Sequence, residues 1–342
     1  MKETKGLLWR VSGAVVVGIV LLLAVGVGAI RMVTEVDPWP VLQAMNVGWL
    51  IAAVLCFVLG NILVGHRFLA MLSEDTPAHR EPWRVGSLFF GASVFSLMLP
   101  GPVGELAACA AIKKRYGIVF SRGLATAVHA RLVGLASAAM MAISVLPFVE
   151  VSSSLGEVLR VGAAMVCVAG LGVGLLTIMP KWMQWVSNAV ERSPLARFLG
   201  SAMILIRALS ETGRAPLKTW LKVFAWSVVI QGVQLLTIFM VGVALGLTPA
   251  FPGLLLAQGT GSLGILVGVI LPGGLGTYEV AIISSFAGPG GLTLASAGVL
   301  AVGIRIVHLL GLGSAGIMFA FWAKVLTAGE VMADVENAQV KH

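Results

Sequence analysis

The chain has 342 residues, of which 58% are hydrophobic and only 11% are charged, and it contains 42 glycines. Soluble domains carry about 25% charged residues, and disordered chains combine low hydrophobicity with high charge. The composition therefore excludes a water-soluble globule and a disordered chain, and it indicates an integral membrane protein.

The formal net charge of +8 would suit a nucleic acid partner only if the basic residues formed one surface of a folded domain. They flank apolar segments instead, so we expect no nucleic acid partner. The three cysteines, Cys56, Cys109 and Cys167, are widely spaced in apolar runs. They predict neither a disulfide framework nor a thiolate metal site, and no cofactor motif is recognised.

Six apolar segments are long enough to cross a bilayer core as helices, which takes about 20 residues each. In chain order these segments are 11–30, 47–65, 120–148, 157–179, 219–245 and 292–323. The first follows basic residues, as a signal peptide does. It exceeds the length of a signal core and no clear cleavage site follows, so we predict a retained span.

Two further apolar stretches, 84–115 and 250–290, are each interrupted near the middle by proline and glycine. Because proline cannot continue the helix that precedes it, each stretch is predicted to form two short helices that meet at a hinge, Pro100 or Pro272. The second helix of the first stretch is too short to cross the core. This favours a re-entrant hairpin, whose irregular backbone must be buried in protein or lie beside a watery cavity.

The two broken stretches have the features of one repeated unit. Glu105 follows the first break and Glu279 the second, and Arg131 and Arg305 follow these glutamates at the same spacing, each inside an apolar span. Three predicted spans separate the hairpins, so the second hairpin must enter from the opposite face. We therefore predict an all-α polytopic membrane protein in a single membrane domain, 1–342. The predicted inverted repeats are residues 1–148 and residues 149–180 with 219–325.

The basic residues predict the orientation of the chain, because short cytoplasmic loops are enriched in Lys and Arg. With the amino terminus inside, most of the basic residues, Arg67 among them, lie on the cytoplasmic side, and the segment 246–291 contains none. We predict a cell (inner) membrane location with both termini cytoplasmic. The connection 181–218 has the spacing of an interfacial helix, either a plain connector or a contact for anionic lipid.

Several motifs together resemble the lysylphosphatidylglycerol synthase transmembrane-region family, also called the flippase-like domain. They are Leu-Pro-Gly-Pro-Val-Gly-Glu at 99–105, the basic cluster at 113–115, the segment 121–128 followed by Arg131, and Pro-Gly-Gly-Leu-Gly at 272–276 with Glu279. The resemblance covers roughly residues 7–325. It implies a stand-alone form, because no aminoacyl-transferase domain precedes the end at His342, and hence movement of a lipid between leaflets without lipid synthesis. Ala107 and Ala108 stand where relatives often carry more polar or basic residues, which leaves the headgroup preference open.

The residues themselves support a transport function. Inverted repeats with broken helices are typical of alternating-access carriers, and the positive end of a helix that begins near either break would favour a lipid phosphate. The candidate substrate-binding residues are Glu105, Arg131, Glu279, Arg305, Tyr278, Gly101, Gly104, Gly273, Gly274 and Gly276. The alternative interpretation of the Glu and Arg residues is a pair of structural ion bridges that hold each hairpin to the next helix, and the two roles overlap.

His308 shares a helix face with Arg305. It is a candidate proton relay, and the alternative is a packed histidine bonded to a backbone carbonyl. No H-E-x-x-H, G-x-S-x-G or Walker A motif is present, so we do not expect an enzyme. Two alternatives to transport stay open. One is an intramembrane lipid-modifying enzyme that uses Glu105 and Glu279 as a carboxylate pair, and the other is a membrane scaffold that transports nothing.

Overall fold

The computed structural model describes most of the chain between residues 43 and 322. The described residues are 43–72, 74–98, 103–148, 188, 208–209, 211–267, 276–287 and 290–322. The predicted spans 11–30 and 157–179 lie outside them, as does most of the connector 181–218. Five predicted site or hinge residues also lie outside: Pro100, Gly101, Pro272, Gly273 and Gly274.

The described chain is helical, and no strand occurs within these ranges. The long helices are α3 (Val47–Met71), α6 (Phe120–Val145), α10 (Leu217–Ala244) and α13 (Leu294–Trp322). The shorter helices are α4 (Pro82–Met98), α5 (Val103–Tyr116), α11 (Phe251–Val267) and α12 (Thr277–Phe286), and two 3-10 turns are η1 (Pro77–Arg80) and η2 (Leu146–Phe148). Among the described helices, four are long and apolar enough to span a membrane: α3, α6 with η2, α10, and α13 up to Gly316.

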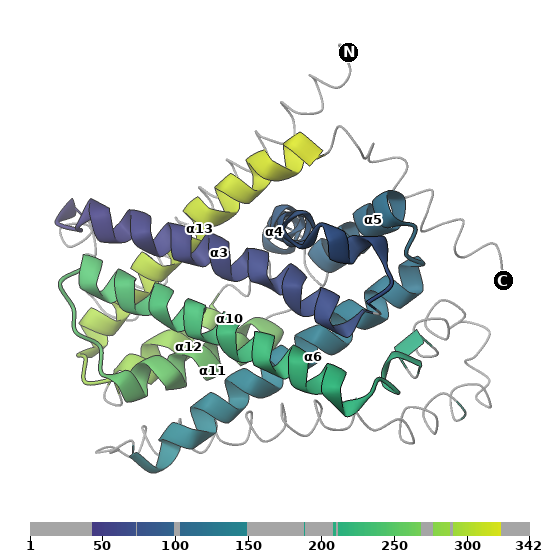
Figure 1. Cartoon of the computed structure of the whole chain (residues 1–342). Coiled ribbons are helices and arrows are strands. Elements are labelled where there is room, and N and C mark those ends of the chain that lie inside the picture. The colour runs from purple at the N-terminus through teal and green to yellow at the C-terminus, as the bar shows by residue number, and fades with distance from the viewer. Residues whose placement is uncertain are drawn as a thin grey trace.

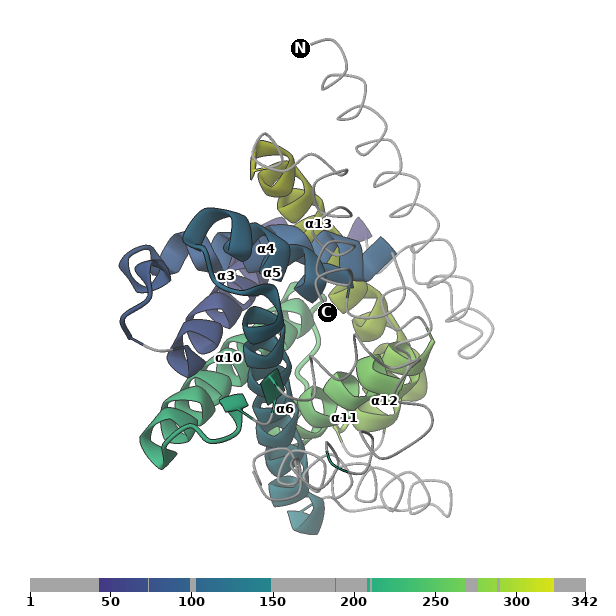
Figure 2. The same cartoon turned by 90° about the vertical axis from the view of Figure 1, so that its right-hand side faces the viewer.

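The residues of the two predicted breaks lie outside the described ranges. On either side of them, α4 runs to Met98 and α5 starts at Val103, while α11 runs to Val267 and α12 starts at Thr277. Within each pair the two helices pack against each other, α4 on α5 and α11 on α12. Figures 1 and 2 show these two helix pairs in different parts of the bundle, with α3, α6, α10 and α13 around them.

Helices α3 and α10 run side by side along the bundle (Figure 1). The side chain of Asn46 caps α3 by accepting hydrogen bonds from the backbone N–H groups of Gly48 and Trp49, at 3.0 and 3.2 Å. The Asn46 N–H itself donates to the carbonyl oxygen of Ala244, 2.8 Å away at the end of α10. The start of α3 therefore meets the end of α10, and the two helices are antiparallel.

Small residues let α3 and α4 approach closely, as is common where helices associate in membranes. A Cβ atom on Gly65 of α3 would lie only 2.4 Å from the Cα atom of Gly86 on α4. Beside this contact, a hydrophobic cluster joins α3, α4 and α5 through side chains such as Phe68, Phe89 and Ile112. The first helix pair is thus fixed to α3 by backbone proximity as well as by apolar packing.

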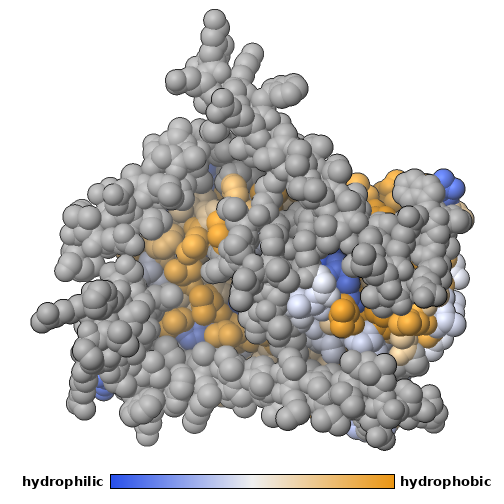
Figure 3. Space-filling model, turned by 180° about the vertical axis from the view of Figure 1, so that it is seen from behind, coloured by the Kyte–Doolittle hydropathy of each residue, from blue (hydrophilic) through white to orange (hydrophobic). Residues whose placement is uncertain are grey.

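A second hydrophobic cluster joins α3, α10, α11, α12 and α13. Its fully buried members include Ile282, Phe286, Leu300 and Ile304. Large apolar side chains on the outer faces of α3 and α10 are instead exposed, among them Ile51, Leu55, Leu221 and Val229. Where described residues are visible in Figure 3, an apolar (orange) patch lies on the left, and on the right apolar residues mix with white to pale blue ones. An apolar exterior around a buried core is the arrangement expected of a multi-pass membrane protein.

Candidate functional site

A buried ion pair joins the second helix pair to α13. The Nε atom of Arg305 on α13 donates to Oε1 of Glu279, 2.6 Å away in the first turn of α12. The two residues are only 5% and 4% exposed. The other carboxylate oxygen of Glu279 accepts the backbone N–H of Gly276 at 2.8 Å, so both oxygens of this carboxylate are engaged.

Gly276 and Tyr278 complete this end of α12. Gly276 has φ = 82°, a left-handed conformation that glycine adopts most readily, and it places its N–H toward Glu279 at the start of the helix. The guanidinium carbon of Arg305 lies 5.1 Å from the centroid of the Tyr278 ring, within the range of a cation–π contact. The structure therefore brings Gly276, Tyr278, Glu279 and Arg305 together, and their predicted role in binding a substrate stays a prediction.

The corresponding ion pair of the first helix pair, between Arg131 and Glu105, is less buried. Arg131 of α6 forms an ion pair with Glu105 in the first turn of α5, and their side chains are 34% and 23% exposed. The second oxygen of Glu105, Oε2, is buried and has no hydrogen-bond partner among the described residues. Nearby, the backbone N–H of Gly104 donates to the hydroxyl of Ser96 at 3.1 Å, which ties the start of α5 to α4.

A third charged residue, Arg67, belongs to the same cluster. The predicted span ends at residue 65, but α3 continues to Met71 and Arg67 is only 8% exposed. The cytoplasmic side predicted for Arg67 stays a prediction. Its charged neighbours are Arg131 and Glu105. Gly134 of α6 makes room for it, because a Cβ atom there would lie 2.0 Å from Nη1 of Arg67. The apolar run Phe-Leu-Ala-Met-Leu at 68–72 was the available signal that the helix continues past this arginine.

A cavity of about 240 Å³ lies between the two helix pairs. Its walls come from α3, α4, α10, α11, α12 and α13. The polar lining residues are Asn61, Ser93, Ser96, Gln234, Thr237, Gln258, Ser262, Tyr278, Arg305 and His308. Tyr278, Arg305 and His308 are among the predicted site residues, and Gln258 stands out in the sequence as a polar group near the second break. The hydroxyl side chains, Asn61 and Gln234 could not be recognised, because such side chains inside helices give no distinctive spacing.

A chain of hydrogen-bonded glutamine side chains runs from this cavity toward the charged residues Arg67, Glu105 and Arg131, here called the Arg67 cluster. Gln258 of α11 donates its amide N–H groups to the side-chain oxygens of Gln231 and of Gln234, the latter at 2.6 Å. Gln231 in turn donates to the carbonyl oxygen of Gly134 at 2.9 Å, and Gly134 packs on Arg67. Buried amides that satisfy one another in this way form a rigid polar connection between the cavity and the Arg67 cluster.

His308 packs between two aromatic rings on the wall of the cavity. Its ring centroid lies 4.7 Å from that of Phe57 and 5.4 Å from that of Tyr278. The proton relay predicted for His308 stays a prediction. His129, which the sequence places off the face of Arg131, is fully buried, and its Nδ1 atom lies 3.1 Å from the carbonyl oxygen of Ala125.

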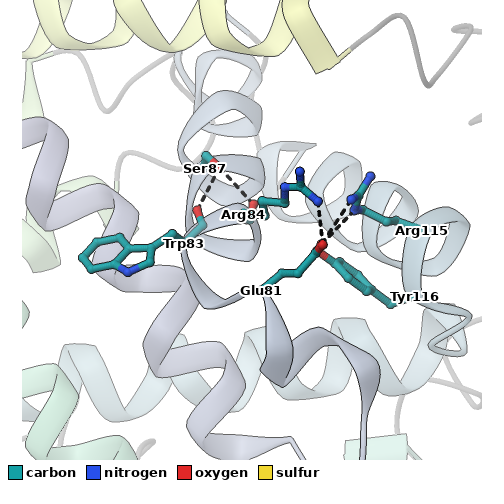
Figure 4. Close-up of polar contacts among 6 residues, drawn as sticks. All are labelled: Glu81, Trp83, Arg84, Ser87, Arg115 and Tyr116. Carbon is teal, nitrogen blue, oxygen red and sulfur yellow. Dashed lines mark hydrogen bonds and ion pairs between the residues drawn. The ribbon is translucent and has the colours of Figure 1, made fainter.

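A separate polar cluster holds the far ends of the first helix pair (Figure 4). Glu81, just before α4, accepts hydrogen bonds from the hydroxyl of Tyr116 at 2.8 Å and from Nη2 of Arg115 at 3.1 Å. The Tyr116 hydrogen bond is the main reason that the pKa of the Glu81 carboxyl lies below its usual value. Because Arg115 and Tyr116 end α5, this cluster fixes the second helix of the pair against the first.

No group of three or more His, Cys, Asp or Glu side chains within the described ranges lies close enough together to hold a metal ion. In comparisons with known proteins, a model of the family described as lysylphosphatidylglycerol synthase TM region matches residues 10–316. No curated protein and no solved structure matches the chain.

Proposed function

Because the chain belongs to the lysylphosphatidylglycerol synthase TM-region family, we propose that it moves an anionic or phosphate-bearing lipid between the leaflets of a cell (inner) membrane. This family is membrane-associated and lipid-related. The proposed mechanism is alternating access at the two helix pairs, without a chemical step.

The observation that carries this proposal is the polar cavity between the two helix pairs. It takes lining residues from α4 of the first pair, from α11 and α12 of the second, and from α13. Binding sites of carriers lie between repeated units, so that motion of one unit against the other changes the side from which the site is reached. A headgroup in this cavity would contact both moving parts.

Reciprocal packing supports the proposed inverted repeats. Helix α4 of the first pair packs on α13, which follows the second pair, and α11 of the second pair packs on α6, which follows the first. Helices α3 and α10, which precede the two pairs, pack on each other. Exchange of this kind is expected where two copies of one unit are related by a two-fold axis.

We assign the substrate phosphate to Arg305, because it is the charged residue among the described residues that line the cavity. Its planar guanidinium suits phosphate oxygens. Tyr278 and the start of α12 at Gly276 lie beside it. Glu105, Arg131 and Gly104 are proposed to serve the symmetry-related position of the transport cycle, and His308 is the proposed route for any coupled proton.

A carrier is favoured over an intramembrane enzyme by the state of the two carboxylates. Glu279 is held by Arg305 and Gly276, and Glu105 by Arg131. A carboxylate pair that performs acid and base catalysis needs a carboxyl group that can exchange a proton with the substrate. Both glutamates are instead committed to a contact with an arginine.

We further propose that both termini are cytoplasmic and that anionic lipid contacts the connector 181–218, most of which lies outside the described residues. The last turn of α5, with Lys113, Lys114 and Arg115, would lie on the same side. Basic residues at that surface would be attracted to anionic headgroups.

The proposal is tested by reconstituting the purified protein into vesicles that contain a fluorescent phospholipid and adding a membrane-impermeant quencher. If the protein transports lipid, the fraction of fluorescence that is quenched should exceed the share of the lipid in the outer leaflet. The variant Arg305→Lys should reach this level more slowly. A scaffold or an enzyme would leave the inner-leaflet lipid protected, and an enzyme would also convert the lipid to a product separable by chromatography.

A further inference from the structure

Three hydroxyl groups on the cavity wall donate to their own helices and keep lone pairs for a ligand. Ser93, Ser262 and Thr237 each donate their single hydroxyl proton to a carbonyl of their own helix, at 2.6, 2.8 and 3.0 Å respectively. A hydroxyl has one proton to donate but two lone pairs. These side chains therefore present acceptors to the cavity, which N–H or O–H groups of a ligand can meet.

Donors face the cavity from other residues. The side-chain oxygen of Gln234 accepts from Gln258 at 2.6 Å, which leaves the amide N–H groups of Gln234 for a ligand. The guanidinium of Arg305 adds a positive charge to the same lining. A site with both acceptors and donors suits a headgroup that carries hydroxyls as well as a phosphate.

The charge of the lining disfavours a cationic headgroup. The described lining residues include Arg305 but no carboxylate. Both oxygens of the nearby Glu279 are already engaged by Arg305 and Gly276. The Tyr278 ring, which could attract an ammonium group, already has the Arg305 guanidinium 5.1 Å from its centroid. A lysyl ammonium would thus meet no unpaired carboxylate among the described lining residues.

We propose that the cavity selects lipids whose headgroup joins a phosphate to free hydroxyl groups, as in a glycerol or polyol phosphate, and disfavours the aminoacylated headgroup for which the family is named. This inference rests on the proposed function, since it takes the cavity to be the substrate site. The acceptor hydroxyls of Ser262 and Thr237 recognise the hydroxyls of the ligand, and Arg305 recognises its phosphate.

The test measures lipid retention by native mass spectrometry on the detergent-purified protein with equal mixtures of lipids of matched acyl chains. Phosphatidylglycerol and phosphatidylinositol carry hydroxyls, phosphatidic acid has the phosphate alone, and lysylphosphatidylglycerol is aminoacylated. We expect the two hydroxylated lipids to be retained at least about tenfold over the other two, which equals about 1.4 kcal/mol. The ratio between the hydroxylated lipids shows whether glycerol or a ring polyol fits better.

A double variant, Ser262→Ala with Thr237→Val, removes two acceptors and keeps nearly the same shape. We expect it to retain phosphatidylglycerol and phosphatidic acid about equally. Ser144→Ala is the matched control, because Ser144 makes the same kind of bond to its own helix, at 2.7 Å, on an exposed surface away from the cavity. That control should keep the wild-type ratio.

Two outcomes separate this inference from the proposed function. Equal retention of lysylphosphatidylglycerol and phosphatidylglycerol by the wild-type protein overturns the inference, even if vesicle assays show that lipid crosses the bilayer. Selective retention of hydroxylated lipids by a protein that moves none of them supports the inference on the cavity and overturns the transport function instead.

Discussion

Neutralising Arg305 alone should destabilise the protein strongly. Glu279 and Arg305 are 4% and 5% exposed, so the variant Arg305→Gln would leave a buried carboxylate without its cation. Removing one partner of a buried ion pair typically costs about 3–5 kcal/mol, whereas removing both charges is often neutral or stabilising. We therefore expect Glu279→Gln with Arg305→Gln to recover most of the lost stability, because the amide oxygen of the new side chain at position 279 can still accept the N–H of Gly276.

The first pair provides an internal comparison. Arg131 and Glu105 are 34% and 23% exposed, and Arg67 remains as a second cation near Glu105. Arg131→Gln should therefore destabilise by only about 1 kcal/mol, as for a partly solvated ion pair. The two single variants thus differ in their expected loss of stability because the two pairs differ in burial. The sequence alone places the two pairs at equivalent positions.

The assay is the apparent melting temperature of each purified variant in detergent, followed by size-exclusion chromatography, together with lipid movement in vesicles. The double variant should melt near the wild type and yet move little lipid, because Arg305 is assigned to the phosphate. Equal destabilisation by Arg131→Gln and Arg305→Gln would refute the reasoning from burial. Wild-type lipid movement by the double variant would refute the role of the guanidinium.

Three further outcomes are expected. Gly65→Ala should destabilise by about 1–3 kcal/mol, because its Cβ would lie 2.4 Å from backbone on α4, and thermal melting in detergent measures this; an unchanged melting temperature would contradict the close approach. The pKa of Glu81 is lowered mainly by its hydrogen bond from Tyr116, so the contribution of this carboxylate to stability is complete at neutral pH. That contribution is lost as the pH falls below the usual value of 4.5 and through the lowered pKa of the folded state. Tyr116→Phe should therefore shift acid unfolding to higher pH, and an identical acid midpoint would count against the hydrogen bond. Single cysteines introduced at the exposed positions Val119 and Thr248 should react with a membrane-impermeant thiol reagent from opposite faces of the membrane, and labelling from the same face would exclude the inverted repeat.

Much of the helical framework could be predicted from the sequence, because it depends on local properties. Apolar runs of sufficient length and helix breaks at proline are readable from single segments, and α6, α10 and α13 begin within two residues of their predicted starts. The equal spacing of Glu105 to Arg131 and of Glu279 to Arg305 likewise indicated two contacts, and the structure forms both ion pairs.

The cavity could not be predicted in the same way, because it depends on how distant helices pack. Gln234 and Gln258 meet only because α10 and α11 are neighbours. Arg67 was predicted to follow the span 47–65 as one of the cytoplasmic basic residues, but the glycine at 134 on a different helix gives it a buried position. Neither contact can be recognised from the spacing of residues within one segment of the chain.

The most direct test of the account is whether lipid movement requires the two helix pairs to move against each other around the cavity. Ser93 of α4 and Ser262 of α11 line the cavity from the two pairs. In a protein whose native cysteines are replaced by serine, Ser93→Cys with Ser262→Cys would be joined by a cleavable bifunctional thiol reagent and assayed in vesicles. Each single cysteine variant treated with the same reagent is the control. We predict that the joined protein moves no lipid and that reductive cleavage of the link restores movement, whereas full movement in the joined state would contradict alternating access at this cavity.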